Sequence, residues 1–361
     1  MRFASSFTGM TTVDPNSQPT PEQRLRGALW GQLVGDAAAL GSHWIYDLDL
    51  MRQRFPQGLS GFEAPAEGHY HFGKTPGDQT HYGDGALVLL ESIAQVGHFD
   101  ARAFGLRFLE TFEPGLYQGY IDQSTKGTIA NYRTFTEAHR ADEFDFQKGA
   151  DDDHLGTASR LAGLVARHRT DPYLLNRVES LTRVCQDNPR TIAYMKAHAL
   201  FLSGLLAGLE PRPALAAVDG RITALEPEAG PEVQEKCRAA LGALKQDVVS
   251  ATLMFGQSCP LEHSFPAALH AFLRHPDDFK TAILATLEAG GDNAGRAAML
   301  GAWLGAHLGL EKIPREWRDR LAHRKRIATA VDQVIEAARR DSGRNGGLNS
   351  DAGDTRRDRI A

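Results

Sequence analysis

Two stretches of the chain carry small residues at every fourth position, and this spacing constrains the fold more than any other feature. The residues are Gly27, Gly31, Gly35 and Ala39 in the first stretch and Ala297, Gly301, Gly305 and Gly309 in the second. A period of four places them on one face of an α-helix. Because glycine inside a helix costs about 0.5–1 kcal/mol relative to alanine, such a bare face needs a packing reason. We therefore expect each face to receive another backbone at close range.

Polar residues beside these stretches connect the packing to a candidate site. Gly290 and Gly291 are suited to close the preceding helix in a left-handed conformation, and Asp292 is suited to cap the next helix. If the two bare faces meet, or pack against the same core helices, Asp36 and Asp292 would face a shared cavity. The alternative is two independent, tightly packed helices with ordinary polar ends.

Composition and charge exclude several classes of protein. The 361 residues are 42% hydrophobic, which allows a sizeable core, and the formal net charge of -5 gives no support for nucleic-acid binding. No apolar run reaches the ~18 residues of a membrane span, and residues 1–20 lack the pattern of a secretory signal. Cys185, Cys237 and Cys259 are an odd and scattered set. We therefore expect no disulfides and a cytoplasmic protein without nucleic-acid or membrane partners.

Helical periodicity runs through most of the chain, and alternating β-type runs are nearly absent. Only residues 251–255 leave a doubt between strand and helix. We predict an all-α fold, a compact single-domain orthogonal bundle of about a dozen or more helices over residues 24–338. Residues 1–23 are predicted to be a disordered lead, and residues 339–361 a disordered tail rich in Gly, Ser, Asn, Asp and Arg.

The polar loop of residues 69–85, H-Y-H-F-G-K-T-P-G-D-Q-T-H-Y-G-D-G, is the strongest candidate for chemistry. It directly precedes a predicted helix, and helix N-termini attract anions through their free N–H groups. A phosphate-bearing ligand is therefore expected there. The simpler interpretation is a solvated loop in which Asp84 caps the helix, but so many polar side chains between two glycine-rich turns favour a functional loop.

The histidines of this loop raise a metal hypothesis. His69, His71 and His81 could hold zinc or another transition metal together with Asp78 or Asp84. No standard ligand spacing supports such a site, so it ranks below the phosphate-binding interpretation.

Three further clusters favour structural explanations. Residues 151–154, Asp-Asp-Asp-His, precede a predicted helix and complement its dipole, with a position at a pocket rim as the alternative. Cys259, followed by a glutamate and a histidine, suggests a nucleophile, but a buried thiol is the simpler interpretation. Trp303 and His307, four residues apart, are predicted to pack in the core.

Three segments of the chain together resemble one known family. They are G-A-L-W-G-Q-L-V-G-D-A near the start, L-V-L-L-E-S after the polar loop, and G-G-D-N-A-G-R-A-A-M-L-G-A-W-L-G-A-H-L-G-L-E-K-I-P-R-E-W near the end. Over most of residues 24–321 the chain resembles the ADP-ribosylglycohydrolase family. The resemblance implies an all-helical domain with two Mg²⁺ ions between a Thr-Asp-Asp and an Asp-x-Asp-Thr segment. It also implies hydrolysis of the bond between ADP-ribose and a protein side chain or small molecule.

Most of the implied metal ligands are missing from this sequence. The family's Thr-Asp-Asp falls on residues 80–82, Thr-His-Tyr, and its Asp-x-Asp-Thr on residues 292–295, Asp-Asn-Ala-Gly. Thr80 and Asp292 remain as metal ligands, and these departures resemble the branch that includes J-type lens crystallins. Magnesium needs several hard oxygen donors and compensating negative charge. We therefore expect one weakly held, hydrated Mg²⁺ or none.

Two functions from different classes follow. The first is a hydrolase that cleaves an ADP-ribosyl or related ribosyl linkage with an altered or absent di-magnesium centre. Its catalytic candidates are Asp292, Asp84, Asp78 and His81, the carboxylates as bases and His81 or His43 as proton donor. Its substrate-binding candidates are Thr80, Gln79, Tyr82, His43, Lys74, Asn293, Arg296 and Asp36, with Arg296 expected to hold a phosphate or carboxylate. The second is an inactive family member that binds ADP-ribose or a nucleotide, or has a structural, crystallin-like role.

Overall fold

The structure is a computed structural model that describes residues 18–348, with side-chain burial described as far as residue 340. Among these residues there is no β-strand, which confirms the predicted all-α fold, and residues 251–255 are helical. The helices are α1 (Pro21–Ala39), α2 (Leu48–Arg54), α3 (His81–Val96), α4 (Ala101–Thr111), α5 (Gln123–Ala138), α6 (Ala162–His168), α7 (Leu174–Cys185), α8 (Pro189–Leu206), α9 (Pro211–Asp219), α10 (Ile222–Leu225), α11 (Gly230–Gly242), α12 (Val248–Phe255), α13 (Leu261–Arg274), α14 (Phe279–Glu288), α15 (Asn293–Leu308), α16 (Arg315–Arg320) and α17 (Arg324–Leu348).

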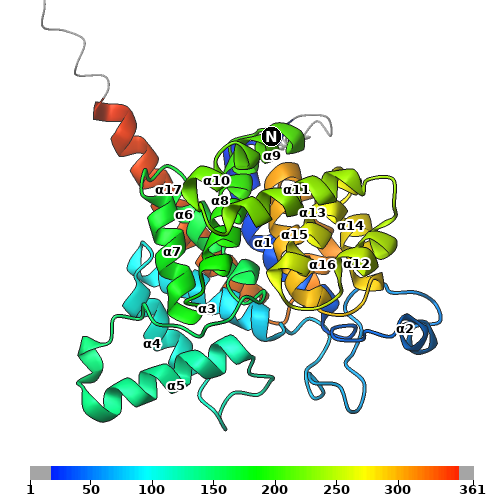
Figure 1. Cartoon of the computed structure of the whole chain (residues 1–361), viewed down its shortest axis with the longest axis horizontal. Helices are drawn as coiled ribbons and strands as arrows, with labels where there is room; N and C mark the ends of the chain where they lie inside the picture. Colours follow the sequence, from blue (N-terminus) through cyan, green and yellow to red (C-terminus); the bar gives the residue numbers. More distant parts are fainter. Residues whose placement is uncertain (1–17, 349–361) are drawn as a thin grey trace, which may run out of the picture.

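The two helices with bare faces, α1 and α15, pack directly against each other near the centre of the molecule (Figure 1). A Cβ added to Gly31 would lie 2.1 Å from Gly301 O, and one added to Gly27 would lie 2.0 Å from Gly305 O. No side-chain carbon fits at such distances, so the two backbones touch along this face. The expectation that the two faces meet is confirmed, and the alternative of two independent helices is wrong.

The start of α1 is fixed both locally and by α15. Thr20 N donates to Gln23 Oε1 at 2.7 Å, and Gln23 N donates to Thr20 Oγ1 at 3.2 Å, which completes a capping box. Arg24 then donates to the carbonyl oxygens of Ala306 and His307, at 3.1 and 2.6 Å. These carbonyls lie in the last turn of α15 and have no partner within that helix, so the arginine ties the two helices together.

An aromatic cluster fills the core on the other side of α15. Trp303 is fully buried, and its indole Nε1 donates to His198 Nδ1 at 2.8 Å. The rings of Phe201 and Phe265 lie 5.2 and 5.7 Å from the indole, both edge-on. The prediction that Trp303 is a core residue is confirmed, and His307 packs edge-on against a further core phenylalanine.

Helices extend slightly beyond the predicted domain boundaries at both ends of the described chain. Helix α1 begins at Pro21 rather than at residue 24, because the capping box lies inside the predicted lead. Helix α17 continues to Leu348, past the predicted start of the tail at residue 339, since an established helix can extend through a few poor helix formers. The rest of the predicted lead and tail, residues 1–17 and 349–361, lies outside the described residues. Within the described chain, no helix has the length and hydropathy to cross a membrane.

Candidate functional site

A buried carboxylate joins the end of α1 to the start of α3. Asp36 accepts hydrogen bonds from Thr80 N at 2.7 Å and from Thr80 Oγ1 at 2.5 Å. A Cβ on Gly83 would lie 2.2 Å from Asp36 Oδ2, so the carboxylate reaches the first turn of α3 only because residue 83 is glycine. Burial raises the pKa of Asp36 to about 7, although the two hydrogen bonds from Thr80 act in the opposite direction. Asp36 and Thr80 are thus bound to each other.

Asp292 lies on the same side of the molecule and is linked to this junction. Tyr82 N donates to Thr80 Oγ1 at 3.1 Å, and Tyr82 OH donates to Asp292 Oδ2 at 2.8 Å. His43 Nδ1 lies 3.8 Å from Asp292 Oδ1. Asp292 makes no capping hydrogen bond to α15, so its predicted capping role is wrong. Its carboxylate points instead toward the hydroxyl of Tyr82.

The backbone around Asp292 is held against the turn that follows α1. Gly290 and Gly291 have φ angles of +66° and +64°, as the sequence predicts, and a Cβ on Gly290 would lie 2.5 Å from Ile45 O. Gly291 N donates to Ile45 O at 2.9 Å, and Trp44 N donates to Gly291 O at 2.8 Å. Asn293 donates to Ser42 Oγ at 3.0 Å. These bonds hold Trp44 at φ +60°, a conformation that non-glycine residues seldom adopt outside functional or constrained segments.

Arg296 is held by protein groups and does not face an open space. Its side chain is fully buried, and it donates to Gln257 O at 2.9 Å and to Gly290 O. Burial lowers the pKa of Arg296 to about 10, and the neighbouring Asp292 limits the decrease. The guanidinium therefore fixes the glycine turn before Asp292, and the expectation that it receives a phosphate finds no support in its contacts.

An aromatic pocket opens beside these groups, with a volume of about 330 Å³. Trp44 is central to its wall, with the ring of Tyr120 at 4.7 Å and that of Tyr70 at 5.0 Å, both edge-on. Tyr70 is 65% exposed, which places it at the mouth of the pocket. The pocket is lined by Trp44, Tyr46, Tyr70, Tyr82, Tyr120, Asp122, Gln123, His154 and Cys259.

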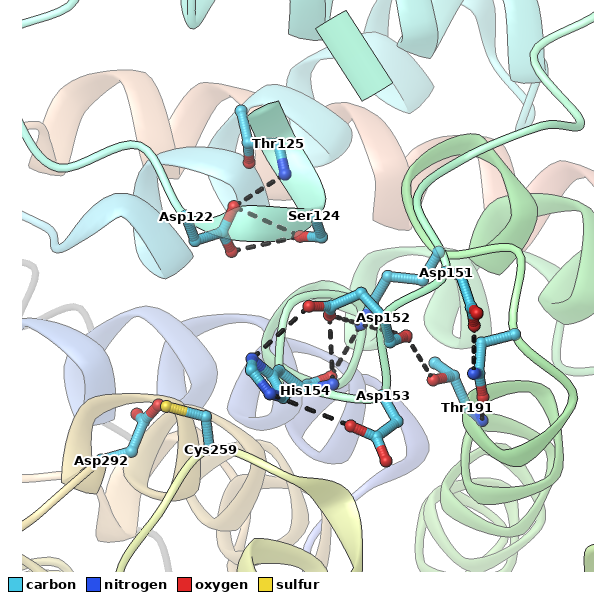
Figure 2. Close-up of polar contacts among 12 residues, drawn as sticks. Asp122, Ser124, Thr125, Asp151, Asp152, Asp153, His154, Thr191, Cys259 and Asp292 are labelled. Carbon is cyan, nitrogen blue, oxygen red and sulfur yellow. Dashed lines mark hydrogen bonds and ion pairs between the residues drawn. The ribbon is translucent and has the colours of Figure 1, made fainter. Parts of the chain in front are cut away.

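The polar groups of the pocket have distinct electrostatic environments (Figure 2). Asp122 accepts from Thr125 N at 2.8 Å, and its carboxylate lies 3.8 Å from His81 Nε2. Burial acts to raise the pKa of Asp122, but His81, Thr125 and a nearby arginine outweigh it, so the pKa lies below its ordinary value. His154 Nδ1 lies 3.4 Å from Asp152 Oδ2, and burial raises the pKa of Asp152. An ionised carboxylate and a carboxylate-backed imidazole thus face one pocket.

Cys259 also contributes to the pocket wall, beside Asp292 (Figure 2). Burial and the adjacent carboxylate of Asp292 raise the pKa of the thiol. The side chain is therefore a neutral thiol at physiological pH, which agrees with the simpler interpretation and argues against a nucleophile. Unlike a core cysteine, it can contact a ligand.

Other side chains of the polar loop form a separate network around Lys74 and Asp84. Lys74 Nζ donates to Asp84 Oδ2 at 2.7 Å and to Gln79 O at 2.7 Å. Tyr117 OH donates to Asp84 at 2.6 Å, and Asp78 accepts from Thr75 N at 2.7 Å. Lys74 and Asp78 line a second hollow of about 450 Å³, which shares Tyr70 with the aromatic pocket. Asp78 and Asp84, the predicted bases, are thus not part of the aromatic pocket.

Three buried histidines come together behind Trp44. His43, His71 and His81 each offer a ring nitrogen, and these atoms lie within 4.8 Å of one another. His69 is not part of the group, because its ring bonds to His43 O at 2.6 Å and accepts from His71 N at 3.0 Å. The structure thus groups His43, rather than the expected His69, with His71 and His81, and neither Asp78 nor Asp84 belongs to this group. Burial, together with the neighbouring imidazoles, lowers the pKa of His43 and of His71, the latter to about 2, so these rings are neutral.

The residues present do not fit a pair of magnesium ions. The hydroxyl of Thr80 donates to Asp36, and Asp292 is the single carboxylate left from the implied ligand segments. Asp292 has the hydroxyl of Tyr82 and the imidazole of His43 beside it, whereas Mg²⁺ requires several oxygen ligands in near-octahedral geometry. The buried cation Arg296 lies beside Asp292 and would repel a second positive charge.

Several pocket residues were missed by sequence reasoning. Asp122 precedes helix α5 and resembles an ordinary N-cap, a role it also fills. Tyr46, Tyr70 and Tyr120 lie in loops, where isolated aromatic residues carry no signal. His154 was considered only as an alternative at a pocket rim, and the structure places it in the pocket wall.

The fold is all-helical around a central pair of glycine-faced helices, and an aromatic pocket lies beside its buried carboxylates. A family profile described as ADP-ribosylglycohydrolase matches residues 17–344. The chain belongs to the ADP-ribosylglycohydrolase family.

Individual relatives agree with this assignment. The chain is 24% identical to crystallin J1A of Tripedalia cystophora over 332 residues, which cover 88% of this chain and 98% of the relative. It is 22% identical to crystallin J1B of the same organism over 331 residues, covering 88% and 98%. An uncharacterised protein of Archaeoglobus fulgidus is 24% identical over 320 residues, covering 87% and 97%. A solved structure described as an ADP-ribosylglycohydrolase-related protein complex has a TM-score of 0.66 at 22% identity, covering 88% of this chain and 99% of that chain, and this likeness supports the fold.

Proposed function

We propose that the chain hydrolyses a ribosyl bond, of ADP-ribosyl or related type, in the aromatic pocket and without a magnesium pair. One observation carries this proposal: Asp122, kept ionised, and His154, backed by Asp152, line the same pocket. Glycoside cleavage needs a carboxylate for the developing positive charge or the attacking water, and a second group for the proton of the leaving group. The substrate is an ADP-ribosylated side chain or a small ribosyl compound.

Each pocket group has a task in the proposed reaction. The rings of Trp44, Tyr70 and Tyr120 stack on a planar part of the substrate and exclude water from the bond. Asp122 stabilises the oxocarbenium-like ribose and orients the water that attacks it. His154 transfers the proton of the leaving group, with Asp152 holding the imidazole in orientation. Asp292 acts through Tyr82, whose hydroxyl it fixes at 2.8 Å.

Replacement of Asp122 by Asn tests the proposal. Peptides carrying ADP-ribose on arginine or serine are the substrates, and released ADP-ribose is quantified by chromatography. We expect Asp122→Asn to lower kcat by about 10²–10⁴-fold, the usual worth of a positioned acid or base, with an unchanged melting temperature. The matched control is Asp145→Asn, a surface carboxylate that binds its own loop at Gln147 N and should retain wild-type activity. Equal activity of both variants would remove Asp122 from the mechanism.

A second candidate is a protein that binds the same ligand without cleaving it. The missing oxygen ligands at residues 81, 82, 294 and 295, and the relatives named as crystallins, favour this alternative. Calorimetric titration of ADP-ribose, with and without Mg²⁺, combined with the release assay separates the two. Binding without turnover of any ADP-ribosylated peptide would support the second candidate. Binding that requires Mg²⁺ would contradict the absence of a magnesium pair.

A further inference from the structure

We propose that His43, His71 and His81 form a binding site for a single transition-metal ion of the Zn²⁺ class. The inference rests on the histidine cluster itself and does not depend on the proposed hydrolysis. The three residues come from separate parts of the fold: the turn after α1, the loop before α3, and the first position of α3. The fold brings these three residues together, although their spacing in the sequence does not indicate a metal-binding motif.

The arrangement of the three rings matches that of a metal centre. The ring centroids lie 5.4 Å apart for His43 and His71, 5.8 Å for His71 and His81, and 6.1 Å for His43 and His81. A tetrahedral ion with metal–nitrogen bonds of about 2.0–2.1 Å places the centroids of its imidazole ligands about 5 Å apart. The observed triangle is therefore nearly equilateral and slightly wider than a loaded site, and the stacked rings of His43 and His71, with planes 16° apart, would turn as the nitrogens move onto one ion.

The cluster leaves polar atoms in the interior without partners. The exposed fractions of His43, His71 and His81 are 0, 1 and 3%. Within the described chain, both ring nitrogens of His71 and of His81, and Nε2 of His43, have no hydrogen-bond partner. Buried polar groups in proteins are nearly always paired, so five unpaired nitrogens at one point require an explanation. A metal ion would account for three of them, because one cation binds one nitrogen on each ring.

Two carboxylates are placed to complete the site. Asp122 Oδ2 lies 3.8 Å from His81 Nε2, and Asp292 Oδ1 lies 3.8 Å from His43 Nδ1. When His43 binds a metal through Nε2, its Nδ1 carries the proton and donates to Asp292 Oδ1, an oxygen that has no other partner in the described chain. The long contact of 3.3 Å from Ala294 N to His43 Nδ1 is then given up. Such carboxylate–histidine–metal chains fix the orientation of ligands in known metal sites.

The donor chemistry selects the kind of ion. Neutral imidazoles suit Zn²⁺, Cu²⁺, Ni²⁺ or Co²⁺ and bind Mg²⁺ poorly, since Mg²⁺ prefers hard oxygen donors. Trp44 covers the cluster on the side of the aromatic pocket, with its ring 4.1 Å from that of His43, 5.6 Å from that of His71 and 5.4 Å from that of His81. The competing explanation is a purely aromatic stack of four rings without an ion.

Metal analysis of the untagged full-length chain tests the proposal. The protein is dialysed against a chelator and then against excess Zn²⁺, and bound metal is measured by mass spectrometry after gel filtration. We expect one Zn²⁺ per chain and a higher melting temperature with Zn²⁺. Mg²⁺ should neither remain bound nor raise the melting temperature. Co²⁺ should give the intense visible absorption of a tetrahedral site. Less than stoichiometric Zn²⁺ together with no Co²⁺ spectrum would overturn the proposal in favour of the aromatic stack.

Substitutions then locate the ion. His71→Ala and His81→Ala should each weaken Zn²⁺ binding by more than the roughly 10–100-fold that loss of an outer partner costs, and abolish the Co²⁺ spectrum. Circular dichroism establishes that each variant is folded, and a variant that does not fold is replaced by His71→Gln. The matched control is His98→Gln, an exposed histidine outside the cluster, which should keep full Zn²⁺ binding. Loss of binding in the control, or its retention in both alanine variants, would contradict the assignment.

Discussion

Asp36 is a buried residue that both holds two helices together and has a raised pKa. It lies in the last turn of the closely packed helix α1, has no exposed surface, and fixes the first turn of α3 through two hydrogen bonds from Thr80. Burial raises its pKa to about 7, so the folded protein binds a proton that the unfolded chain, with an ordinary aspartate pKa of about 3.9, has already lost at pH 5 or 6.

The pKa of Asp36 predicts a pH dependence of stability. Because the folded-state pKa is raised, this residue makes the free energy of unfolding fall as pH rises from about 4 to about 7, by up to roughly 4 kcal/mol. Asp36→Asn carries no titrating group, so this part of the decrease should be missing. Urea denaturation of both proteins between pH 4 and pH 8 measures it. If the free energies of unfolding of the two proteins changed in parallel between pH 4 and pH 8, Asp36 would have an ordinary pKa.

At the scale of elements, the contact between α1 and α15 determines the positions of the buried polar residues at the ends of these helices. The glycine face lets the two backbones touch, and the polar ends of the same helices then place Asp36 near Thr80 and Asp292 near Tyr82. The cost of several helix-interior glycines is offset by dispersion contacts over the whole length of the pair.

A single methyl group on this face should therefore be destabilising. Gly31→Ala is expected to lower the free energy of unfolding by about 2–3 kcal/mol or more, because a gain of about 1 kcal/mol in helix propensity is outweighed by the overlap with Gly301 O at 2.1 Å. The control is Gly242→Ala at the end of α11, where no atom lies within 4 Å of the new Cβ. That variant should be neutral or up to about 1 kcal/mol more stable in urea denaturation. A similar effect of the two changes would show that the helices do not touch at Gly31.

At the scale of the whole molecule, the first and last parts of the chain close one core. Helix α17 packs against α3, α6 and α1 with a buried apolar face that includes Ile327, Val331 and Val334. Helix α1 lies beneath α17, and α15 is buried between α1 and the helices α8, α13 and α14, so the hydrogen bonds of both are reached only when the core opens. The loop of residues 57–79, by contrast, contains many exposed residues and little regular structure.

This arrangement predicts a gradient of hydrogen exchange. Amides of α1 and α15 should exchange only through global unfolding, whereas those of residues 57–79 should exchange through local opening at much lower free energy. Mass spectrometry of peptides at low denaturant concentrations measures both. Gly31→Ala should accelerate exchange in α1 and α15 by the same factor. Exchange of α1 peptides at a free energy below that of global unfolding would contradict a single cooperative core.

Local sequence features determined the helical class and the position of the glycine faces. These follow from periodicity, capping chemistry and backbone freedom, which act over a few residues. The candidate status of Thr80 and Asp292 as ligands came from the resemblance to the family. The glycine faces also carried a long-range prediction, because a backbone without side chains can be explained only by a partner at close range.

The tertiary structure alone decided which polar groups share a site. Asp122 and Tyr120 enter the aromatic pocket from the segment before α5, and His43 replaces His69 among the three clustered histidines. Arg296, expected to hold a ligand, is instead bound to backbone carbonyls. Loops bring these side chains together from distant parts of the chain, and their contacts depend on how the helices pack rather than on any local pattern. The physical reason is that capping and helix periodicity are properties of neighbouring residues, whereas a pocket is a property of the packed core.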